Sequence, residues 1–354
     1  MEESLKDLKR ISWVCSEEEY RADPAYSYST LAKYNREGFN KLDSLFDKVE
    51  SPSLTFGSAV DAIITGGQEE FDRNFMVVDL PNIPDSASNC VRIIWNKYKD
   101  TYKHLNEIPM DILNTELQLN GFWPNSRYSA QARINGFFKN PVEDYYQLNY
   151  IAENKSIITT ELYMQILQAV NALKTSPATK NYFAEDNPWD NSIERLYQLK
   201  FRADLNGVGY RCMMDECIVL HDKKLIIPVD LKTSCSCEEK DFYFNFLQWH
   251  YQLQARLYSR ILRANLDQDE YFKDFKILNY RFIFCHKDSC SPLVWEFEET
   301  HSKGTLYLGR HKQIGLPDPE DLGRELYLFF SSGQKPEEPL IADRNLLDSW
   351  INLL

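Results

Sequence analysis

The stretch VGYRCMMDECIVLHDKKLIIPVDLK spans residues 208–232 and contains two strand-like runs on either side of a short polar segment. Aromatic and β-branched residues are frequent in both runs, and residues 221–224 carry the turn signal between them. If the turn is symmetric about its centre, Asp215 lies opposite Asp230, with their Cβ atoms roughly 5 Å apart. The stretch therefore predicts a β-hairpin that brings two carboxylates together.

A lysine and a backbone carbonyl extend this acidic pair. Strand periodicity places Lys232 on the same face as Asp230, with Leu231 pointing away. Two carboxylates this close are stable only if they share a proton or bind a cation, and Mg²⁺ or Mn²⁺ prefers such oxygen ligands. The Leu231 carbonyl would supply a further oxygen. A bound metal would polarise a phosphoryl oxygen, and Lys232 would stabilise charge developing on phosphorus.

A simpler interpretation treats the same residues as surface charges. Asp215 and Asp230 would then be exposed hairpin acids, with Lys232 as their ion-pair partner. However, Asp230 follows the apolar run 225–229, which predicts that it is buried. A buried acid needs a partner, so a functional site is favoured.

The remaining segments predict an α/β (α+β) fold with a central mixed sheet flanked by helices. Asn206-Gly207 is a strong hairpin signal that joins a strand at 193–202 to the hairpin described above. The first half of the chain reads mainly as helical, and more helices and strands follow the hairpin. The expected helices are 29–46, 58–64, 86–121, 159–174, one or two within 241–266, and others within 299–332; the later strands are 280–285 and 293–297.

The chain shows no internal repeat and no convincing linker, which favours a single domain over residues 1–354. Within it we expect a helical N-terminal part over about 1–185, a sheet core over about 190–300 and C-terminal helices over about 300–354. The eight cysteines lack the paired spacing of a zinc ribbon and are expected to be reduced.

Composition limits the compartment and the partners. No apolar run approaches the roughly 20 residues of a membrane span, and the N-terminus lacks the order of a secretory signal, so we expect a cytoplasmic protein without membrane contact. The net charge of −13 counts against a polyanionic partner. However, the net charge of the whole chain does not determine the electrostatic potential at one site. Carboxylates that bind a metal also contribute to the negative net charge.

The acidic pair has a family resemblance. Asp215, followed after fourteen residues by Asp230-Leu231-Lys232, resembles the signature of the PD-(D/E)XK nucleases, although Met214 stands at the proline position. Gln254 and Tyr258 lie four residues apart on the helix after this strand and resemble the Q-x-x-x-Y motif of the RecB-like branch. The resemblance implies a restriction-endonuclease-like sheet core.

Two upstream acids extend the resemblance. Glu194 resembles the glutamate that precedes the catalytic hairpin in RecE-like and lambda-exonuclease-like enzymes, and the first hairpin could bring it near the acidic pair. Asp61 stands where related proteins carry a histidine ligand. The expected catalytic residues are thus Asp215, Asp230, Lys232, Glu194, Gln254 and Tyr258, and the expected metal ligands are Asp215, Asp230, Leu231, Asp61 and Glu194.

The resemblance implies a Mg²⁺- or Mn²⁺-dependent DNA nuclease, most simply a RecE/lambda-type exodeoxyribonuclease of recombination or DNA processing in a bacterial or phage-infected cell. It further implies action on double-stranded ends, a ring-like homo-oligomer and a single-strand annealing protein as partner. An endonuclease or single-strand-specific nuclease of the same fold stays open, as does an inactive module that binds DNA or protein. The candidate phosphate contacts, for which solvated charge is the alternative, are Lys200, Arg202, Arg211 and Arg256.

Overall fold

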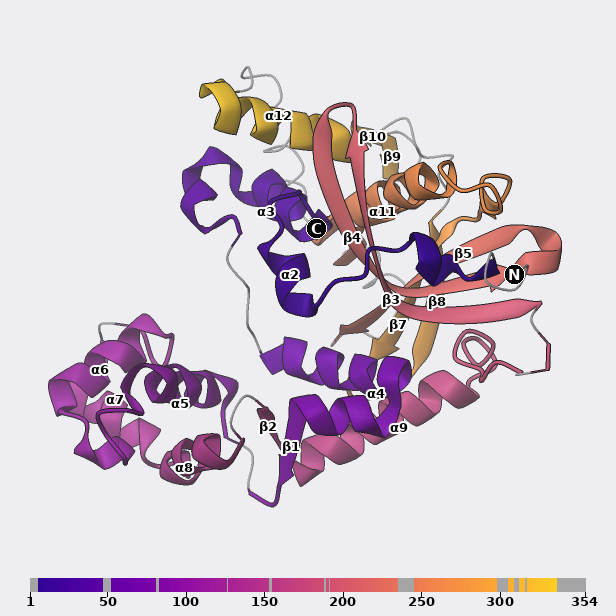
Figure 1. Cartoon of the computed structure of the whole chain (residues 1–354). Coiled ribbons are helices and arrows are strands. Elements are labelled where there is room, and N and C mark those ends of the chain that lie inside the picture. The colour runs from indigo at the N-terminus through magenta and orange to yellow at the C-terminus, as the bar shows by residue number, and fades with distance from the viewer. Residues whose placement is uncertain are drawn as a thin grey trace. The chain divides into compact units, whose positions relative to one another are not determined.

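The computed structural model describes residues 6–46, 52–80, 83–125, 127–152, 155–187, 189–190, 192–234, 245–297, 305–308, 312–315 and 317–335. Its internal contacts group the chain into two compact units, Met1–Lys48 with Leu173–Leu354 and the intervening Val49–Ala172. The sequence led us to expect one domain. The difference arises because the intervening segment folds on a hydrophobic core of its own (Figure 1).

The first unit is built on a six-stranded mixed sheet with the order β3-β4-β5-β7-β8, in which β6 also pairs with β5. The pairs β3–β4, β4–β5 and β7–β8 are antiparallel, whereas β5–β7 is parallel. This arrangement confirms the predicted mixed sheet flanked by helices. The strands are β3 Ile193–Leu205, β4 Val208–Leu220, β5 Leu225–Ser234, β6 Lys276–Ile277, β7 Tyr280–His286 and β8 Pro292–Phe297.

The turn between β3 and β4 follows the predicted chemistry. Asn206 and Gly207 both have positive φ, 56° and 81°, which these two residue types tolerate. Leu205 pairs with Val208, so the hairpin closes at the two-residue turn. The Asp204 carboxylate also accepts a hydrogen bond from the Gly207 N–H at 2.7 Å. The local sequence therefore determines the register of this hairpin.

Helix α11, Tyr251–Leu266, packs against β3 and β4 and builds the main core. Leu253, Leu257 and Ile261 recur at helical spacing and are fully buried. They meet strand side chains that include Phe201 and Phe282. This packing places one side of α11 directly over the sheet segment that carries the candidate site.

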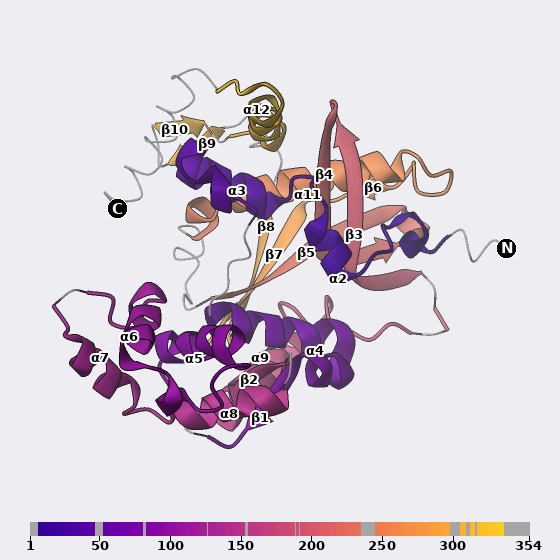
Figure 2. The same ribbon diagram turned by 60° about the vertical axis from the view of Figure 1, so that its left-hand side comes forward.

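The N-terminal and C-terminal segments complete the first unit. Helix α3 contacts α11 and α12, and α12 also packs near the β3–β4 hairpin (Figure 2). The N–H of Trp13 donates to the Lys200 carbonyl at 2.7 Å and ties the start of the chain to β3. These elements are η1 Leu8–Ile11, α2 Glu17–Ala22, α3 Tyr28–Glu37, η2 Gly38–Ser44, η4 His221–Lys223, β9 Thr305–Leu308, β10 Lys312–Gly315 and α12 Pro319–Ser332.

The second unit is mainly helical and contains one two-stranded parallel sheet. Its core includes Ile94, Leu117, Phe137 and Tyr146. Helix α4 bends at Gly67, whose φ of 68° and ψ of −164° are not helical. The elements are α4 Pro52–Asn74, β1 Phe75–Val78, α5 Asp85–Tyr98, η3 Leu105–Glu107, α6 Met110–Leu119, α7 Ala130–Phe137, α8 Val142–Ala152, β2 Ser156–Thr159 and α9 Thr160–Thr175, which runs into the first unit.

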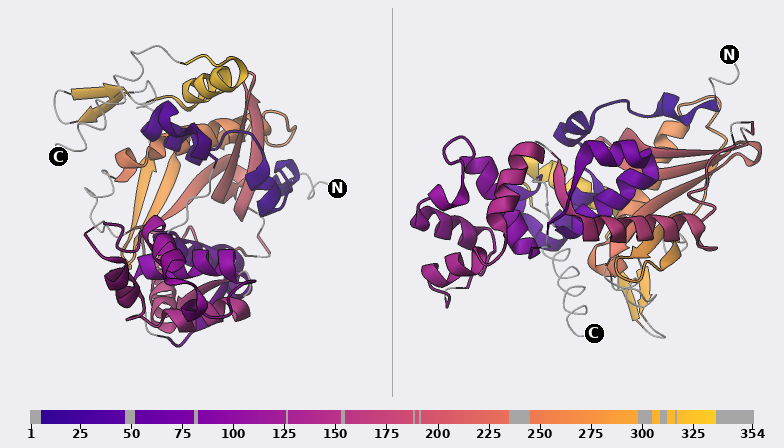
Figure 3. Two further views of the ribbon diagram at one scale, coloured as in Figure 1. Left: turned by 90° about the vertical axis from the view of Figure 1, so that its left-hand side faces the viewer. Right: turned by 90° about the horizontal axis from the view of Figure 1, so that it is seen from below.

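The prediction of helices within 299–332 did not anticipate the two strands in its first part. Strands β9 and β10 pair antiparallel, with Thr305 opposite Gly315, and are drawn side by side in the left view of Figure 3. The helical prediction holds for α12, which begins after the N-cap Asp318 and ends at Ser332, with Gly333 as its C-cap. Among the helices of the described residues, none combines the length and apolar character of a membrane span. The six described cysteines are free thiols.

Helix α12 approaches β4 so closely that only glycine fits at one position. A methyl group at Gly323 would lie 2.1 Å from the Tyr210 hydroxyl oxygen. We expect Gly323→Ala to lower the free energy of unfolding by about 1–3 kcal/mol, because either α12 or the tyrosine must shift. Urea denaturation measures the change. Ser331→Ala at the exposed end of α12 is the control, and equal stability of the two variants would contradict the prediction.

Candidate active site

The hairpin formed by β4 and β5 has the predicted register. Glu216 pairs with Val229 and Leu220 pairs with Leu225, so the strands are symmetric about the turn. Lys224 adopts a left-handed conformation at the end of that turn, with φ 51°. Asp215 and Asp230 occupy the next position beyond the last pair, Glu216 and Val229. The register thus places the two acids at corresponding positions on neighbouring strands, as expected.

Beyond Val229, the pairing of β5 with β4 ends, whereas its pairing with β7 on the other edge continues. Asp230 pairs with Phe282 of β7, and the ladder with β4 has ended. The Asp215 carboxylate takes the place of the missing backbone partner, because its Oδ2 accepts a hydrogen bond from the Leu231 N–H at 2.9 Å. The Asp215 side chain is therefore bonded to the residue that follows Asp230.

Both strands of the first hairpin lose their regular alternation at this level. Core residues of β4 recur every second position up to Met214, but the next one is Cys217. Leu196 and Leu199 show the same three-residue step on β3. Gln198, which stands opposite Asp215, has a φ of 53°, and the ladder is interrupted at this pair. Such backbone strain at a single level commonly accompanies a functional residue.

Asp230 is a buried acid with two partners. Its side chain is almost completely inaccessible, with 1% of the residue exposed. The Lys232 ammonium forms an ion pair with Oδ2, and the Gln254 side-chain amide donates a hydrogen bond to Oδ1. A buried carboxylate needs such partners to offset its lost hydration. Asp230, Lys232 and Gln254 therefore form one connected polar cluster, as the sequence predicted.

Lys232 remains an ammonium group in this cluster. Burial is the largest single effect and lowers its pKa, but the interactions with Asp230, Tyr251 and Asp215 together outweigh it, so the net pKa is raised. Its Nζ lies 5.1 Å from the centroid of the Tyr251 ring. An ammonium over an aromatic face is stabilised by the ring quadrupole. Lys232 thus presents a positive charge beside the two acids.

Helix α11 supplies three residues to the cluster through one face. Gln254 and Tyr258 are four residues apart, and Tyr251 precedes Gln254 by three, so all three project to the same side. Tyr258 is buried beside Tyr280, with 6.3 Å between ring centroids, and burial raises its pKa well above the usual value. The sequence interpretation missed Tyr251, although its spacing from Gln254 was the available signal.

The donor chemistry of the site fits a hard divalent cation. Asp215 and Asp230 offer carboxylate oxygens, and the Leu231 carbonyl is the expected third donor. Mg²⁺ is commonly held by one or two carboxylates because it keeps several of its waters. No group of three or more His, Cys, Asp or Glu residues suited to a metal occurs in the described part of the chain. The two carboxylates and the carbonyl are oxygen donors of the kind that Mg²⁺ prefers.

The two upstream acids have different outcomes. The expectation that the first hairpin brings Glu194 to the acidic pair is wrong, because Glu194 pairs with Val219, four residues beyond Asp215 along β4. Its carboxylate lies 3.4 Å from the ring of the buried His221. Asp61 belongs to α4 in the second unit, where its carbonyl accepts from the Thr65 hydroxyl at 2.9 Å. Its role as a ligand stays a prediction.

Three of the expected phosphate contacts instead hold the N-terminal segment. The Lys200 ammonium donates to the Cys15 carbonyl at 2.7 Å. Arg202 pairs with the Asp23 carboxylate at 3.1 Å, and Arg211 bonds to the carbonyls of Asp23 and Ala25. Sequence alone could not reveal this, because the covering segment is almost 200 residues away from these strands.

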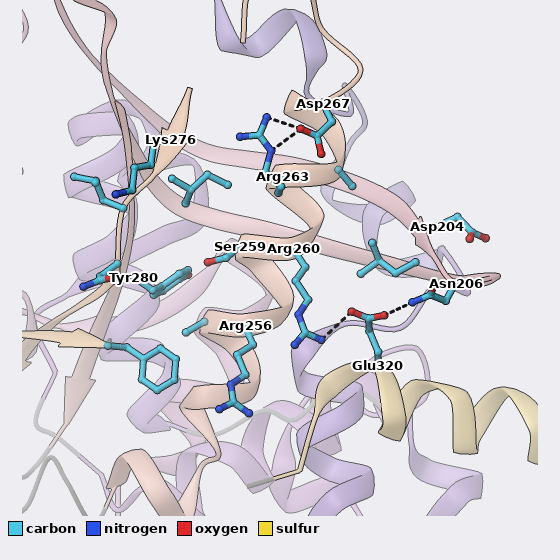
Figure 4. A pocket seen from close by; sticks show the side chains of 17 residues that line it. Asp204, Asn206, Arg256, Ser259, Arg260, Arg263, Asp267, Lys276, Tyr280 and Glu320 are labelled. Atoms are coloured by element: carbon cyan, nitrogen blue, oxygen red, sulfur yellow. Dashed lines mark hydrogen bonds and ion pairs between the residues drawn. The ribbon is translucent and has the colours of Figure 1, made fainter. Parts of the chain in front are cut away.

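The fourth, Arg256, lines a cavity of about 680 Å³ beside α11 (Figure 4). Only 2% of Arg256 is exposed, which contradicts a role as an accessible phosphate contact. The neighbouring Arg260 pairs with Asp318 at 2.7 Å and with Glu320 at 2.8 Å, while Arg263 pairs with Asp267. Two of the basic groups that line this cavity, Arg260 and Arg263, are thus already paired with acids.

Comparisons with known proteins give limited information. No family model matches the sequence, and no curated protein matches it significantly. A crystal structure from Eubacterium rectale named "Putative exonuclease" aligns with 75% of this chain and 87% of its own, at 12% identity and a TM-score of 0.29. At this TM-score the likeness supports neither a fold family nor an activity for this chain.

Proposed function

We propose that this chain is a metal-dependent nuclease that hydrolyses phosphodiester bonds in DNA. The observation that supports it most is the environment of Asp230, a buried carboxylate bound by Lys232 and Gln254 beside Asp215. An acid that only stabilised the fold would gain more from a single neutral partner or from replacement by an apolar residue. Burial, a paired acid and a retained ammonium together favour chemistry on a phosphate.

Each residue has a distinct task in this proposal. Asp215, Asp230 and the Leu231 carbonyl would hold Mg²⁺ or Mn²⁺, which would supply polarisation of a phosphoryl oxygen and a lowered pKa of water. Gln254 orients the Asp230 carboxylate through its hydrogen bond. Lys232 presents its ammonium to the negative charge that develops on the phosphate.

The finer proposal is a RecE/lambda-type exodeoxyribonuclease that acts on double-stranded ends in the bacterial or phage-infected cytoplasm. It rests on the resemblance carried by Asp215, Asp230-Leu231-Lys232, Gln254 and Tyr258. We propose that the chain forms a ring and passes single strands to an annealing protein. A ring with a basic lumen and an acidic exterior would accommodate the net charge of −13.

The test is degradation of DNA by the purified full-length chain with Mg²⁺, Mn²⁺ or EDTA. Linear duplexes labelled at either end are compared with closed circular duplex and with single strands. We expect metal-dependent loss of label from linear duplex ends and intact circles. Rapid cutting of circles would replace the exonuclease with an endonuclease, and degradation of single strands only would indicate a single-strand-specific enzyme. Absence of degradation with every metal would overturn the proposal and favour a binding module.

A further inference from the structure

An exposed tryptophan lies on the turn that leads into α11. Trp249 is 43% exposed, and the guanidinium carbon of Arg36 lies 5.3 Å from the centroid of its ring. The next residue, His250, has a φ of 56°, an uncommon conformation for a side chain of this size. The turn therefore has a defined left-handed conformation at His250 and exposes the Trp249 indole at the surface.

Three contacts connect helix α3 to this turn. The Tyr28 hydroxyl donates to the Trp249 carbonyl at 2.6 Å. The Asn35 side-chain nitrogen lies 3.0 Å from Nε2 of the buried His250 ring. Arg36, one residue further on, covers the indole. One helix thus fixes the backbone of the turn and also supplies the cation at its surface.

The turn is next to the candidate active site. Tyr251, two residues after Trp249, carries the ring over which Lys232 lies. Two peptide steps span at most about 7.6 Å between Cα atoms. Tyr28 contacts the same Tyr251, with 6.4 Å between ring centroids. The turn that carries the indole is therefore connected to the candidate site through Tyr251, which contacts both Lys232 and Tyr28.

The Arg36 guanidinium is available for a ligand. In the part of the chain that the structure describes, no carboxylate is paired with it. The neighbouring Lys33 instead donates to the Ser44 carbonyl, and Glu37 pairs with Lys41 at 3.8 Å. An exposed indole beside an unneutralised guanidinium is the combination that stacks a nucleobase and binds its phosphate.

We propose that Trp249 and Arg36 bind one unstacked nucleotide of the substrate, next to the phosphate that is cleaved. Trp249 stacks on the base, and Arg36 contacts the adjoining phosphate. Since a base inside an intact duplex has no free face, this pair selects single strands or the frayed end of a duplex. The proposal rests on the proposed nuclease function and specifies which part of the substrate is recognised.

The first test compares steady-state kinetics of Trp249→Ala and Arg36→Ala with the wild-type chain on single-stranded and frayed-end DNA. We expect KM to rise about tenfold and kcat to stay within about threefold, because stacking contributes to binding rather than to the chemical step. Trp189→Ala is the matched control, since Trp189 is 93% exposed and belongs to a different loop. Trp249→Phe, which keeps an aromatic face, should recover most of the affinity. A Trp249→Ala variant with the KM of the Trp189→Ala control would overturn the proposal.

The second test does not require activity. A single-stranded oligonucleotide should quench tryptophan fluorescence in the wild-type chain, and Trp249→Phe should lose this quenching while Trp189→Phe retains it. Removing one base at a time from the oligonucleotide should locate a position where the abasic site weakens wild-type binding but not Trp249→Ala binding. No such position, or quenching that persists in Trp249→Phe, would refute the stacking. If the quenching occurs and no metal supports degradation, the nuclease proposal fails alone.

Discussion

Asp230→Asn is expected to lower the rate of DNA degradation by about 1000-fold or more. The amide keeps the volume of the carboxylate and can still accept the Gln254 hydrogen bond, but it loses the charge that binds a divalent cation. A bound metal contributes several kcal/mol of charge stabilisation in the transition state, and about 4 kcal/mol corresponds to this factor. The measurement is single-turnover degradation of end-labelled duplex at saturating Mg²⁺.

The matched control is Asp222→Asn, on the turn of the same hairpin. Asp222 is exposed and lies away from the acidic pair, so its replacement should leave the rate unchanged. Circular dichroism on both variants separates lost chemistry from lost folding. Near wild-type degradation by a folded Asp230→Asn chain would show that Asp230 is not a metal ligand.

Arg211→Ala is expected to lower the free energy of unfolding by on the order of 3 kcal/mol. Arg211 is buried, donates to the Ala25 carbonyl at 2.5 Å and lies 3.9 Å from the Asp23 carboxylate, which is itself buried. Alanine would leave these acceptors without their partner, and unpaired buried acceptors are costly, more so when charged. Urea denaturation followed by circular dichroism measures the loss.

Arg21→Ala provides the comparison for this change. Arg21 is 54% exposed, and among the described residues its ion-pair partner is Glu17, one helical turn away, so its removal should change stability by less than about 0.5 kcal/mol. The binding of DNA is expected to be equal in both variants. Weakened binding by Arg211→Ala at unchanged stability would restore Arg211 as a phosphate contact and contradict its structural role.

The hairpin and its two acids could be predicted because the signals for them lie within a short stretch of sequence. Strand periodicity and a polar turn are sufficient to place Asp215 and Asp230 at corresponding positions, and helical spacing is sufficient to align Gln254 with Tyr258. The same reasoning about turns already places Glu194 opposite Val219. The expectation for Glu194 failed because a position four residues from Asp215 along β4 lies too far from the acidic pair.

The other differences arise from contacts between distant segments. Whether Lys200 or Arg211 faces water depends on residues 13–25, which cover them. The sequence of the strands contains no signal for this contact. The division into two units depends on the separate core of residues 49–172, whose ends carry no linker composition. Periodicity describes one element at a time and cannot determine which elements pack together.

The interrupted alternation of β3 and β4 limits how far the stability of this hairpin can be increased. A redesigned hairpin with unbroken alternation would remove the positive φ at Gln198 and gain stability. The same repair would rotate the side chain at position 215 to the other surface of the sheet and release it from Leu231. Selection for thermal stability would thus act against the acidic pair, and a regular hairpin is the change to look for in relatives that lack the proposed activity.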